Sequence, residues 1–323
     1  MPHPSPTDTT APDPKARDIA RVGVIGNPRS HRNRGRIRRP DATESIILWH
    51  EPSAIEELRG VIERFRTEQV DLIVIDGGDG TVRDVMGVVD AVYPDALPRF
   101  AIIPSGKTNA LAIDLDVPAH WQVNDAIAAH AADSISHRCA LRVQWNDRAV
   151  PDQMGFIFGL GVFRRATDLA QELHGLGLFN SVAVVLTVAL SLFRTLLQRG
   201  PGSWRHGELV RTSPQGEPKR LFLVLASTLR RMPGGLKPLG AEREGLRFLM
   251  VDAPPRALYR HALSIVIGRE TAAQERAGYH RMDLESLTIE SPEGIVIDGE
   301  GFPGGSITVS QSRPIEFVVP AQC

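Results

Sequence analysis

Short apolar runs alternate with helix-periodic stretches over the first third of the chain. Four runs have the length of a buried strand: Ala20–Pro28, Ser45–His50, Leu72–Asp76 and Arg99–Gly106. Ser53–Gln69 and Val82–Ala91 instead repeat their apolar residues at helical spacing, and Ser53 is expected to cap the first helix with Glu56 three residues on. Strands that alternate with helices in this way predict βαβ units and a parallel sheet covered on both faces.

The pattern changes near residue 135, where short strand-like runs follow one another with Gly, Pro, Asp and Ser between them. These runs are Ala140–Trp145, Gln153–Phe163, Arg220–Ser227, Leu246–Val251, Ser286–Ser291, Gly294–Glu300 and Ser306–Ser310. They are typical of an antiparallel β-sandwich, interrupted here by helical stretches at Gly175–Phe193 and Pro255–Gly268. The predicted fold class is therefore α/β + β, with an N-terminal α/β domain and a C-terminal β-sandwich with helical insertions.

The predicted domain boundaries follow from this change of pattern. We predict an α/β domain at residues 21–134 and a β-sandwich domain at residues 135–305. Residues 1–20, rich in Pro, Thr and Asp, are predicted to be a disordered tail. Residues 306–323 are predicted to form a C-terminal segment, with a return to the first domain as one option.

Composition is that of an ordinary globular protein, since 42% of the 323 residues are hydrophobic and 23% are charged. A formal net charge of −1 gives no general attraction to nucleic acid, so no nucleic-acid partner is expected, and the one concentrated basic stretch is Arg29–Arg39. The two cysteines, Cys139 and Cys323, suit a reducing compartment. The N-terminal residues lack a signal-peptide core, and we expect a cytoplasmic protein.

The stretch Gly175–Phe193 carries no charge and is about as long as a bilayer is thick. Its glycine-rich start and its polar residues, such as Asn180 and Ser191, are unusual for a spanning helix. We expect a buried or membrane-facing amphipathic helix, and interfacial insertion and a true span are the alternatives. Peripheral contact with the inner face of the membrane is therefore expected.

Gly77-Gly78-Asp79-Gly80-Thr81 follows the third predicted strand directly. Glycines let backbone N–H groups approach an anion, and Thr81 stands where a helix begins. An acid among phosphate-binding amides suggests a bridging divalent cation, so Asp79 is the candidate ligand for Mg²⁺. The alternative is a tight strand-to-helix turn in which the aspartates only cap the helix.

A second turn of this kind follows the fourth predicted strand. Ser105, Gly106, Lys107, Thr108 and Asn109 precede a short helix, Ala110–Ile113. In a parallel sheet two such turns can face one nucleotide, with Lys107 either on a phosphate or at the surface. The loop Gly26–Arg39 is expected at the same edge, where its arginines suit phosphates or an anionic membrane, or form a basic excursion without a ligand.

The segment Ile295–Gly305 also contains an apolar strand followed by acids and glycines. Glu300 within it is a candidate general base that takes a proton from a hydroxyl nucleophile. A plain hairpin turn is the alternative interpretation.

Taken in order, these segments resemble the diacylglycerol kinase catalytic family of lipid kinases, over roughly Val22 to Pro320. The motifs are GGDGT at Gly77–Thr81, PSGKTN at Pro104–Asn109 and DGE at Asp298–Glu300. The resemblance implies an ATP- and Mg²⁺-dependent kinase, with a nucleotide-binding domain followed by a lipid-binding domain. It implies that Asn27, Gly77, Gly78, Asp79, Gly80, Thr81, Ser105, Gly106, Lys107 and Asn109 line the nucleotide site. Glu300 is the implied base, a lipid the implied substrate, and Asp84 stands where the family has a glutamate.

Some positions depart from the family pattern and keep two alternatives open. Neutral or basic residues stand near Cys139 and Phe163 where the family often has aspartates, and Glu244 replaces an aspartate tied to a structural Mg²⁺ in some members. One alternative is a nucleotide-binding or membrane-associated regulatory protein without turnover. The other is an NAD kinase, which shares the GGDGT turn. A homodimer is left open.

Overall fold

Four parallel strands form the sheet of the first domain, in the order β2–β1–β3–β4. They are β1 (Arg21–Gly26), β2 (Ile46–His50), β3 (Leu72–Gly77) and β4 (Arg99–Pro104). The computed structural model describes residues 21–33, 46–167, 204–212 and 217–321. Every residue of β3 is buried, as expected for a parallel strand with both faces covered.

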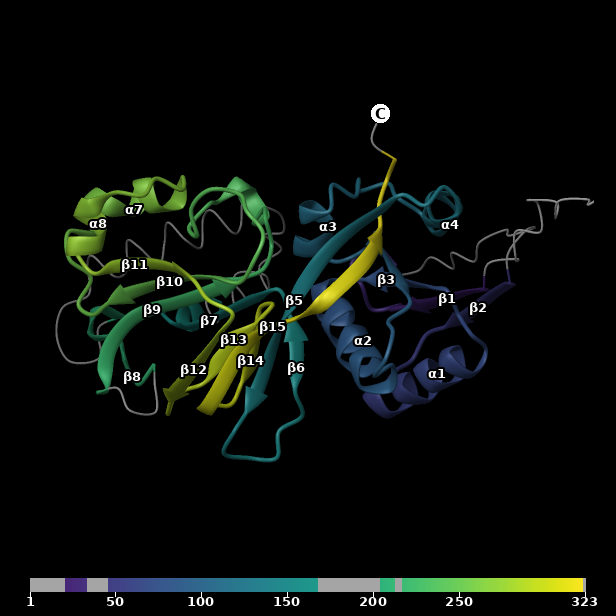
Figure 1. The fold of residues 1–323 in the computed structure, drawn as a ribbon, viewed down its shortest axis with the longest axis horizontal. Helices are drawn as coiled ribbons and strands as arrows, with labels where there is room; N and C mark the ends of the chain where they lie inside the picture. The colour runs from purple at the N-terminus through teal and green to yellow at the C-terminus, as the bar shows by residue number, and fades with distance from the viewer. Residues whose placement is uncertain (1–20, 34–45, 168–203, 213–216, 322–323) are drawn as a thin grey trace, which may run out of the picture.

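Four helices cover this sheet: α1 (Ile55–Thr67), α2 (Asp79–Val92), α3 (Ala110–Asp114) and α4 (Val123–Ala131). Figure 1 shows α1 and α2 on one face and α3 and α4 on the other. Two helix starts differ from the expectation. The N-cap of α1 is Ala54 and not Ser53, so Glu56 makes no capping box. The third residue of the helix is Glu57, which accepts hydrogen bonds from the N–H and the hydroxyl of Ser53. Helix α2 begins at Asp79, before Val82, and the glycine-rich motif supplies its first turn.

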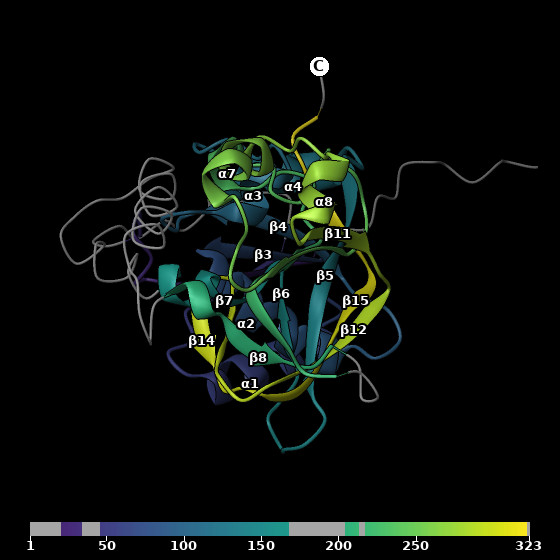
Figure 2. The ribbon, with the colours of Figure 1, turned by 90° about the vertical axis from the view of Figure 1, so that its left-hand side faces the viewer.

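Two long strands, β5 (Ile135–Trp145) and β15 (Gly305–Val318), run through both domains. They pair antiparallel along most of their length, and Phe317 of β15 also aligns with Phe100 of β4 in parallel. Strands β6 (Gln153–Gly155) and β12 (Ser286–Ser291) pair with β5 and β15. The parallel sheet is therefore part of one mixed eight-stranded sheet that continues into the second domain (Figure 2).

A separate seven-stranded sheet completes the second domain, and its pairings are all antiparallel. Its strands are β7 (Ile157–Gly161), β8 (Glu208–Val210), β9 (Lys219–Ser227), β10 (Arg247–Asp252), β11 (Tyr279–Asp283), β13 (Ile295–Ile297) and β14 (Glu300–Phe302). A core that includes Leu141 and Val309 from the mixed sheet and Phe158 and Phe248 from the other lies between the two sheets. The predicted two-domain α/β and β-sandwich fold is confirmed.

Helices α7 (Leu258–Val266) and α8 (Ala272–Arg276) lie beside the seven-stranded sheet, and α7 falls within the predicted helical stretch Pro255–Gly268. Two 3-10 turns, Trp204–His206 and Pro233–Gly235, complete the described elements. The predicted helix Gly175–Phe193 lies outside the described residues. Within the ranges that the structure describes, no helix is both long enough and apolar enough to cross a membrane.

Candidate active site

The glycine-rich stretch Gly77–Thr81 joins the end of β3 to the start of α2. Gly78 is the N-cap of α2, so Asp79, Gly80 and Thr81 form the first helical turn. The N–H groups of these three residues have no hydrogen-bond partners within the helix. A β-carbon on Gly77 would lie 2.6 Å from the Cβ of Thr81, so this turn requires glycine. The helix start thus offers the N–H donors and partial positive charge that bind a phosphate group.

The second turn, Ser105–Asn109, follows β4 and packs directly against the first. A β-carbon on Gly106 would lie 2.5 Å from the Cα of Gly78, so the two backbones meet where neither residue has a side chain. Asn109 has a φ of 54° and closes the turn, because its Oδ1 accepts from the N–H of Gly106 at 2.8 Å. Lys107 is exposed on this turn. The two turns lie side by side at the carboxyl edge of the sheet.

The loop after β1 joins them through a small polar network. Asn27 Nδ2 donates to Thr81 Oγ1 at 2.8 Å. Asp76, which is buried at the end of β3, accepts from Asn33 Nδ2 at 3.0 Å and from the Ser105 hydroxyl. The ends of β1, β3 and β4 are thereby tied together. All the residues expected to line the nucleotide site, from Asn27 to Asn109, gather at this edge.

Asp79 has a structural contact besides the role in metal binding expected of it. Its Oδ1 accepts a hydrogen bond of 2.7 Å from the N–H of Ala110, the first residue of α3. Burial raises the pKa of Asp79, and the N–H groups of Ala110, Leu111 and Asn109 oppose that rise. This carboxylate therefore caps the neighbouring helix α3. In the part of the chain that the structure describes, no three His, Cys, Asp or Glu side chains cluster as ligands of a metal ion.

Glu300 brings the second domain onto the first glycine-rich turn. It begins β14, and a β-carbon on Gly80 would lie 2.9 Å from its Oε1. Its Oε2 forms an ion pair of 2.6 Å with Nη2 of Arg83, which also pairs with Asp84 at 2.8 Å. The Glu300 side chain is 55% exposed, so the carboxylate is accessible to a bound molecule. The structure thus brings the candidate base and the GGDGT turn together.

Arg83 is the nearly buried cation at the centre of this group. It is 5% exposed, and its Nη1 is buried without a hydrogen-bond partner among the described residues. Its guanidinium lies 5.3 Å from the centre of the Phe302 ring of β14. Burial lowers the pKa of Arg83, but Asp84 and Glu300 outweigh burial and raise it. Arg83 therefore stays charged and links α2 to the strand that carries Glu300.

A second acid, Asp298, lies beside Asp79. It has a φ of 48° and accepts hydrogen bonds from the N–H groups of Phe156, at 3.0 Å, and Ile157, at 2.8 Å. Burial and then the charge of Asp79 raise the pKa of Asp298 to about 7, although the two amides and Arg83 act in the other direction. Two neighbouring carboxyl groups in such surroundings favour a retained proton or a bound cation.

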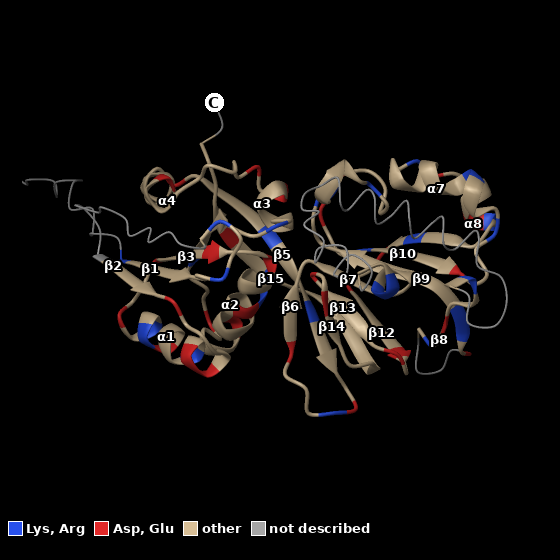
Figure 3. Cartoon of the chain, turned by 180° about the vertical axis from the view of Figure 1, so that it is seen from behind, with Lys and Arg blue, Asp and Glu red and all other residues tan. Residues whose placement is uncertain are grey.

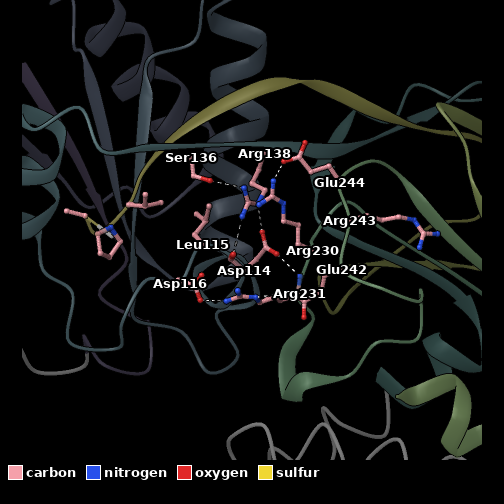
Figure 4. A pocket seen from close by; sticks show the side chains of 13 residues that line it. Asp114, Leu115, Asp116, Ser136, Arg138, Arg230, Arg231, Glu242, Arg243 and Glu244 are labelled. Carbon is pink, nitrogen blue, oxygen red and sulfur yellow. Dashed lines mark hydrogen bonds and ion pairs between the residues drawn. The ribbon is translucent and has the colours of Figure 1, made fainter. Parts of the chain in front are cut away.

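A pocket of about 620 Å³ lies at another place on the domain junction and is not lined by the glycine-rich turns (Figure 4). Asp114 of α3 and Arg138 of β5 form a buried ion pair of 2.5 Å there. Asp114 also accepts from the N–H of Arg231 at 2.7 Å. Arg230 forms an ion pair with Glu244, the residue that replaces the family's metal-linked aspartate. At this position an arginine neutralises the carboxylate.

Four residues of the site were not predicted as site residues from the sequence: Asn33, Asp76, Arg83 and Asp298. Asp76 and Asp298 each had a signal in the sequence, because both are acids at the end of an apolar run and lie one and two residues before the predicted site residues Gly77 and Glu300. Arg83 had none, since a charged residue on an amphipathic helix usually faces solvent. Asn33 lies in an irregular loop, where no periodic pattern marks a buried side chain.

The first domain is similar to a known protein family. Residues 21–141 match the family model of the diacylglycerol kinase catalytic domain. Over this stretch, which is less than half of its length, the chain is similar to the diacylglycerol kinase catalytic-domain family. A protein of Streptococcus pneumoniae whose name describes a lipid kinase is 25% identical over 136 residues, which are 42% of this chain and 41% of that protein. The match thus spans less than half the length of this relative.

Solved structures extend the likeness in fold beyond the family domain. Two crystal structures from Bacillus anthracis, named for diacylglycerol kinases, superpose on this chain with TM-scores of 0.65 and 0.60. Their sequences are 14% and 15% identical to it, and each comparison covers 93% of this chain and 97% of the other. The family resemblance read from the motifs is confirmed, and the two-domain fold is shared with these structures.

Proposed function

We propose that the chain is a lipid kinase that transfers the terminal phosphoryl group of ATP to a lipid hydroxyl. The contact between Glu300 and Gly80 carries the proposal. Phosphoryl transfer needs the phosphates held in place and the acceptor hydroxyl near a base. Here the accessible acid of β14 lies against the start of α2, whose first N–H groups have no partners within the helix, so one bound nucleotide and one hydroxyl can meet at this point.

The residues of the site fit the phosphates of a nucleotide. Gly78 and Gly106 approach too closely for side chains, and the first turn of α2 offers N–H donors beside them. A divalent cation also fits the donor set, because Asp79 and Asp298 are neighbouring carboxyl groups in surroundings that raise both pKa values. These two residues would hold the cation. When bound, Mg²⁺ supplies positive charge that stabilises the phosphate oxygens during transfer.

Glu300 is the proposed general base. It takes the proton of the lipid hydroxyl as the oxygen of that hydroxyl attacks the γ-phosphorus in line with the leaving oxygen. Arg83 positions it, since the ion pair of 2.6 Å holds the carboxylate over Gly80. Asp84, which stands where the family has a glutamate, pairs with the same Nη2 atom of Arg83 at 2.8 Å.

The test is transfer of labelled phosphate from ATP, with Mg²⁺, into a total lipid extract, followed by identification of the product by mass. Glu300→Gln should slow transfer by roughly 10²- to 10⁴-fold, because it removes the base. Its nucleotide affinity should stay near that of the wild type, because the glycine-rich turns are unchanged. Glu63→Gln, which neutralises an exposed glutamate of α1, is the matched control and should retain full transfer.

The other outcomes separate the alternatives. Loss of nucleotide binding together with transfer in Glu300→Gln would refute the assignment of the base. ATP binding by the wild type with no transfer to any lipid would favour a regulatory protein that kept the fold. Formation of NADP from NAD would make the chain an NAD kinase.

A further inference from the structure

Helix α7 is fixed on the outer side of the seven-stranded sheet. Leu258 and Ile265 are buried in a core with residues of β9, β10 and β11. The Tyr279 hydroxyl donates to the carbonyl oxygen of Arg256, just before the helix, at 2.9 Å. Gln274 of α8 donates to the Ser264 hydroxyl at 2.8 Å. The helix is therefore held along its length, and its outer face has one defined orientation.

That outer face is also apolar. Tyr259 and Leu263 are each 71% exposed and Ile267, the C-cap residue, is 47% exposed. Residues spaced by four are neighbours on a helix, so the three side chains form one continuous stripe. A helix that is apolar on both faces is normally buried on both. Within the described residues nothing covers this stripe, which indicates that it meets a partner.

The charges within the segment that carries the stripe are all positive. From Ala253 to Arg269 the chain contains Arg256, Arg260 and Arg269 and no aspartate or glutamate. The guanidinium of Arg260 lies 5.9 Å from the centre of the Tyr259 ring. The acids at the two ends of this segment are already paired, Asp252 with Lys219 at 2.7 Å and Glu270 with Arg243 at 3.7 Å. Figure 3 shows basic positions around α7 and α8 at this end of the molecule.

We propose that the outer face of α7 docks on an anionic lipid bilayer. Apolar side chains with an aromatic among them enter the boundary between head groups and acyl chains, and flanking arginines bind anionic head groups. A second copy of the chain is the poorer fit, because a two-fold contact would bring the same arginines face to face. The inference goes beyond the proposed reaction, since it concerns binding alone and needs no turnover.

Sedimentation of the full chain with vesicles, without ATP, tests the docking face. Vesicles that contain phosphatidylglycerol should bind the chain, and vesicles of phosphatidylcholine alone should bind it weakly. Combining Tyr259→Ser with Leu263→Ser should weaken binding roughly tenfold or more, because two inserted side chains are lost. Ile55→Ser, at a residue 50% exposed on α1 of the other domain, is the matched control and should leave binding unchanged.

A charge variant tests the second half of the proposal. Combining Arg256→Gln with Arg260→Gln should weaken binding several-fold and reduce its dependence on salt. Unchanged vesicle binding in the apolar double variant, with its folding verified by circular dichroism, would overturn the proposal. So would equal binding to both kinds of vesicle. A wild-type dimer that the apolar variant turns into a monomer, without vesicle binding by either protein, would assign the face to self-association instead.

Discussion

Replacing Arg83 by glutamine tests whether this nearly buried arginine positions Glu300. Its side chain is 6% exposed and pairs with Glu300 at 2.6 Å and with Asp84 at 2.8 Å. Removing one partner of a fully buried ion pair costs about 3–5 kcal/mol of stability. Here the two carboxylates are 55% and 45% exposed and can be rehydrated, so we expect a loss of about 1–2 kcal/mol in the free energy of unfolding.

The effect of Arg83→Gln on transfer should exceed its effect on stability. Displacement of a catalytic group by about 1 Å can slow a reaction by on the order of 100-fold, so we expect transfer to fall roughly 10- to 100-fold at saturating ATP. The dissociation constant of the nucleotide should stay near that of the wild type. Arg83→Lys keeps the charge but cannot bind two carboxylates with a planar fork, and it should be intermediate.

Urea unfolding and steady-state transfer measure the two effects separately. Arg64→Gln is the control, because Arg64 forms an exposed ion pair with Glu68 within α1, and we expect a change of no more than about 0.5 kcal/mol. Transfer at the wild-type rate in Arg83→Gln, with the expected loss of stability, would refute the positioning role. A parallel fall in nucleotide affinity would instead place the arginine on the phosphates.

Two further variants test the packing of the site and the burial of a charge. Gly106→Ala should separate the glycine-rich turns, because its β-carbon would meet Gly78, and should lower nucleotide affinity about tenfold or more in a titration. The control is Gly87→Ala in α2, where a β-carbon would have no neighbour within 4 Å. This variant should keep the nucleotide affinity of the wild type and add about 0.5–1 kcal/mol to the free energy of unfolding. Burial, and then Glu293, raises the pKa of Glu208 from 4.5 to about 7, so the folded state retains the proton. The contribution of protonated Glu208 to the free energy of unfolding is full below pH 4.5 and is lost as the pH rises through about 7. The loss over this range is on the order of 3 kcal/mol. Glu208→Gln should therefore melt at a higher temperature than the wild type at pH 8 but not at pH 4, and identical pH profiles would contradict this.

The parallel strands could be predicted because they are buried along their whole length. Every residue of β3 is buried, so an unbroken apolar run marks it. Strand β15 could not be predicted as a whole, and only its first part, Ser306–Ser310, was recognised as a strand. It places Ile307 in the sandwich core and Phe317 in the core of the first domain, and its register shifts between Gln311 and Pro314. Pro314 lies inside this strand, and a proline in a sequence usually argues against a central strand.

The same distinction applies to the site. The glycine-rich turns could be predicted from sequence, because the need for glycine arises from contacts within and between two adjacent turns. The pairing of Arg83 with Glu300 could not, because it depends on how the two domains pack. The capping of α3 by Asp79 was hidden for a similar reason, since the helix that it caps follows the next strand of the sheet.

The position of β15 within the mixed sheet has a consequence for folding during synthesis. It is the last described strand to leave the ribosome, yet it lies between β4 and β5 in the sheet. Until it arrives, β4 has an unpaired edge and Phe100 lacks the ring of Phe317, whose centre lies 6.0 Å away in the finished protein. The first domain therefore cannot complete its core until β15 has been translated, and the two domains finish folding together from that point on.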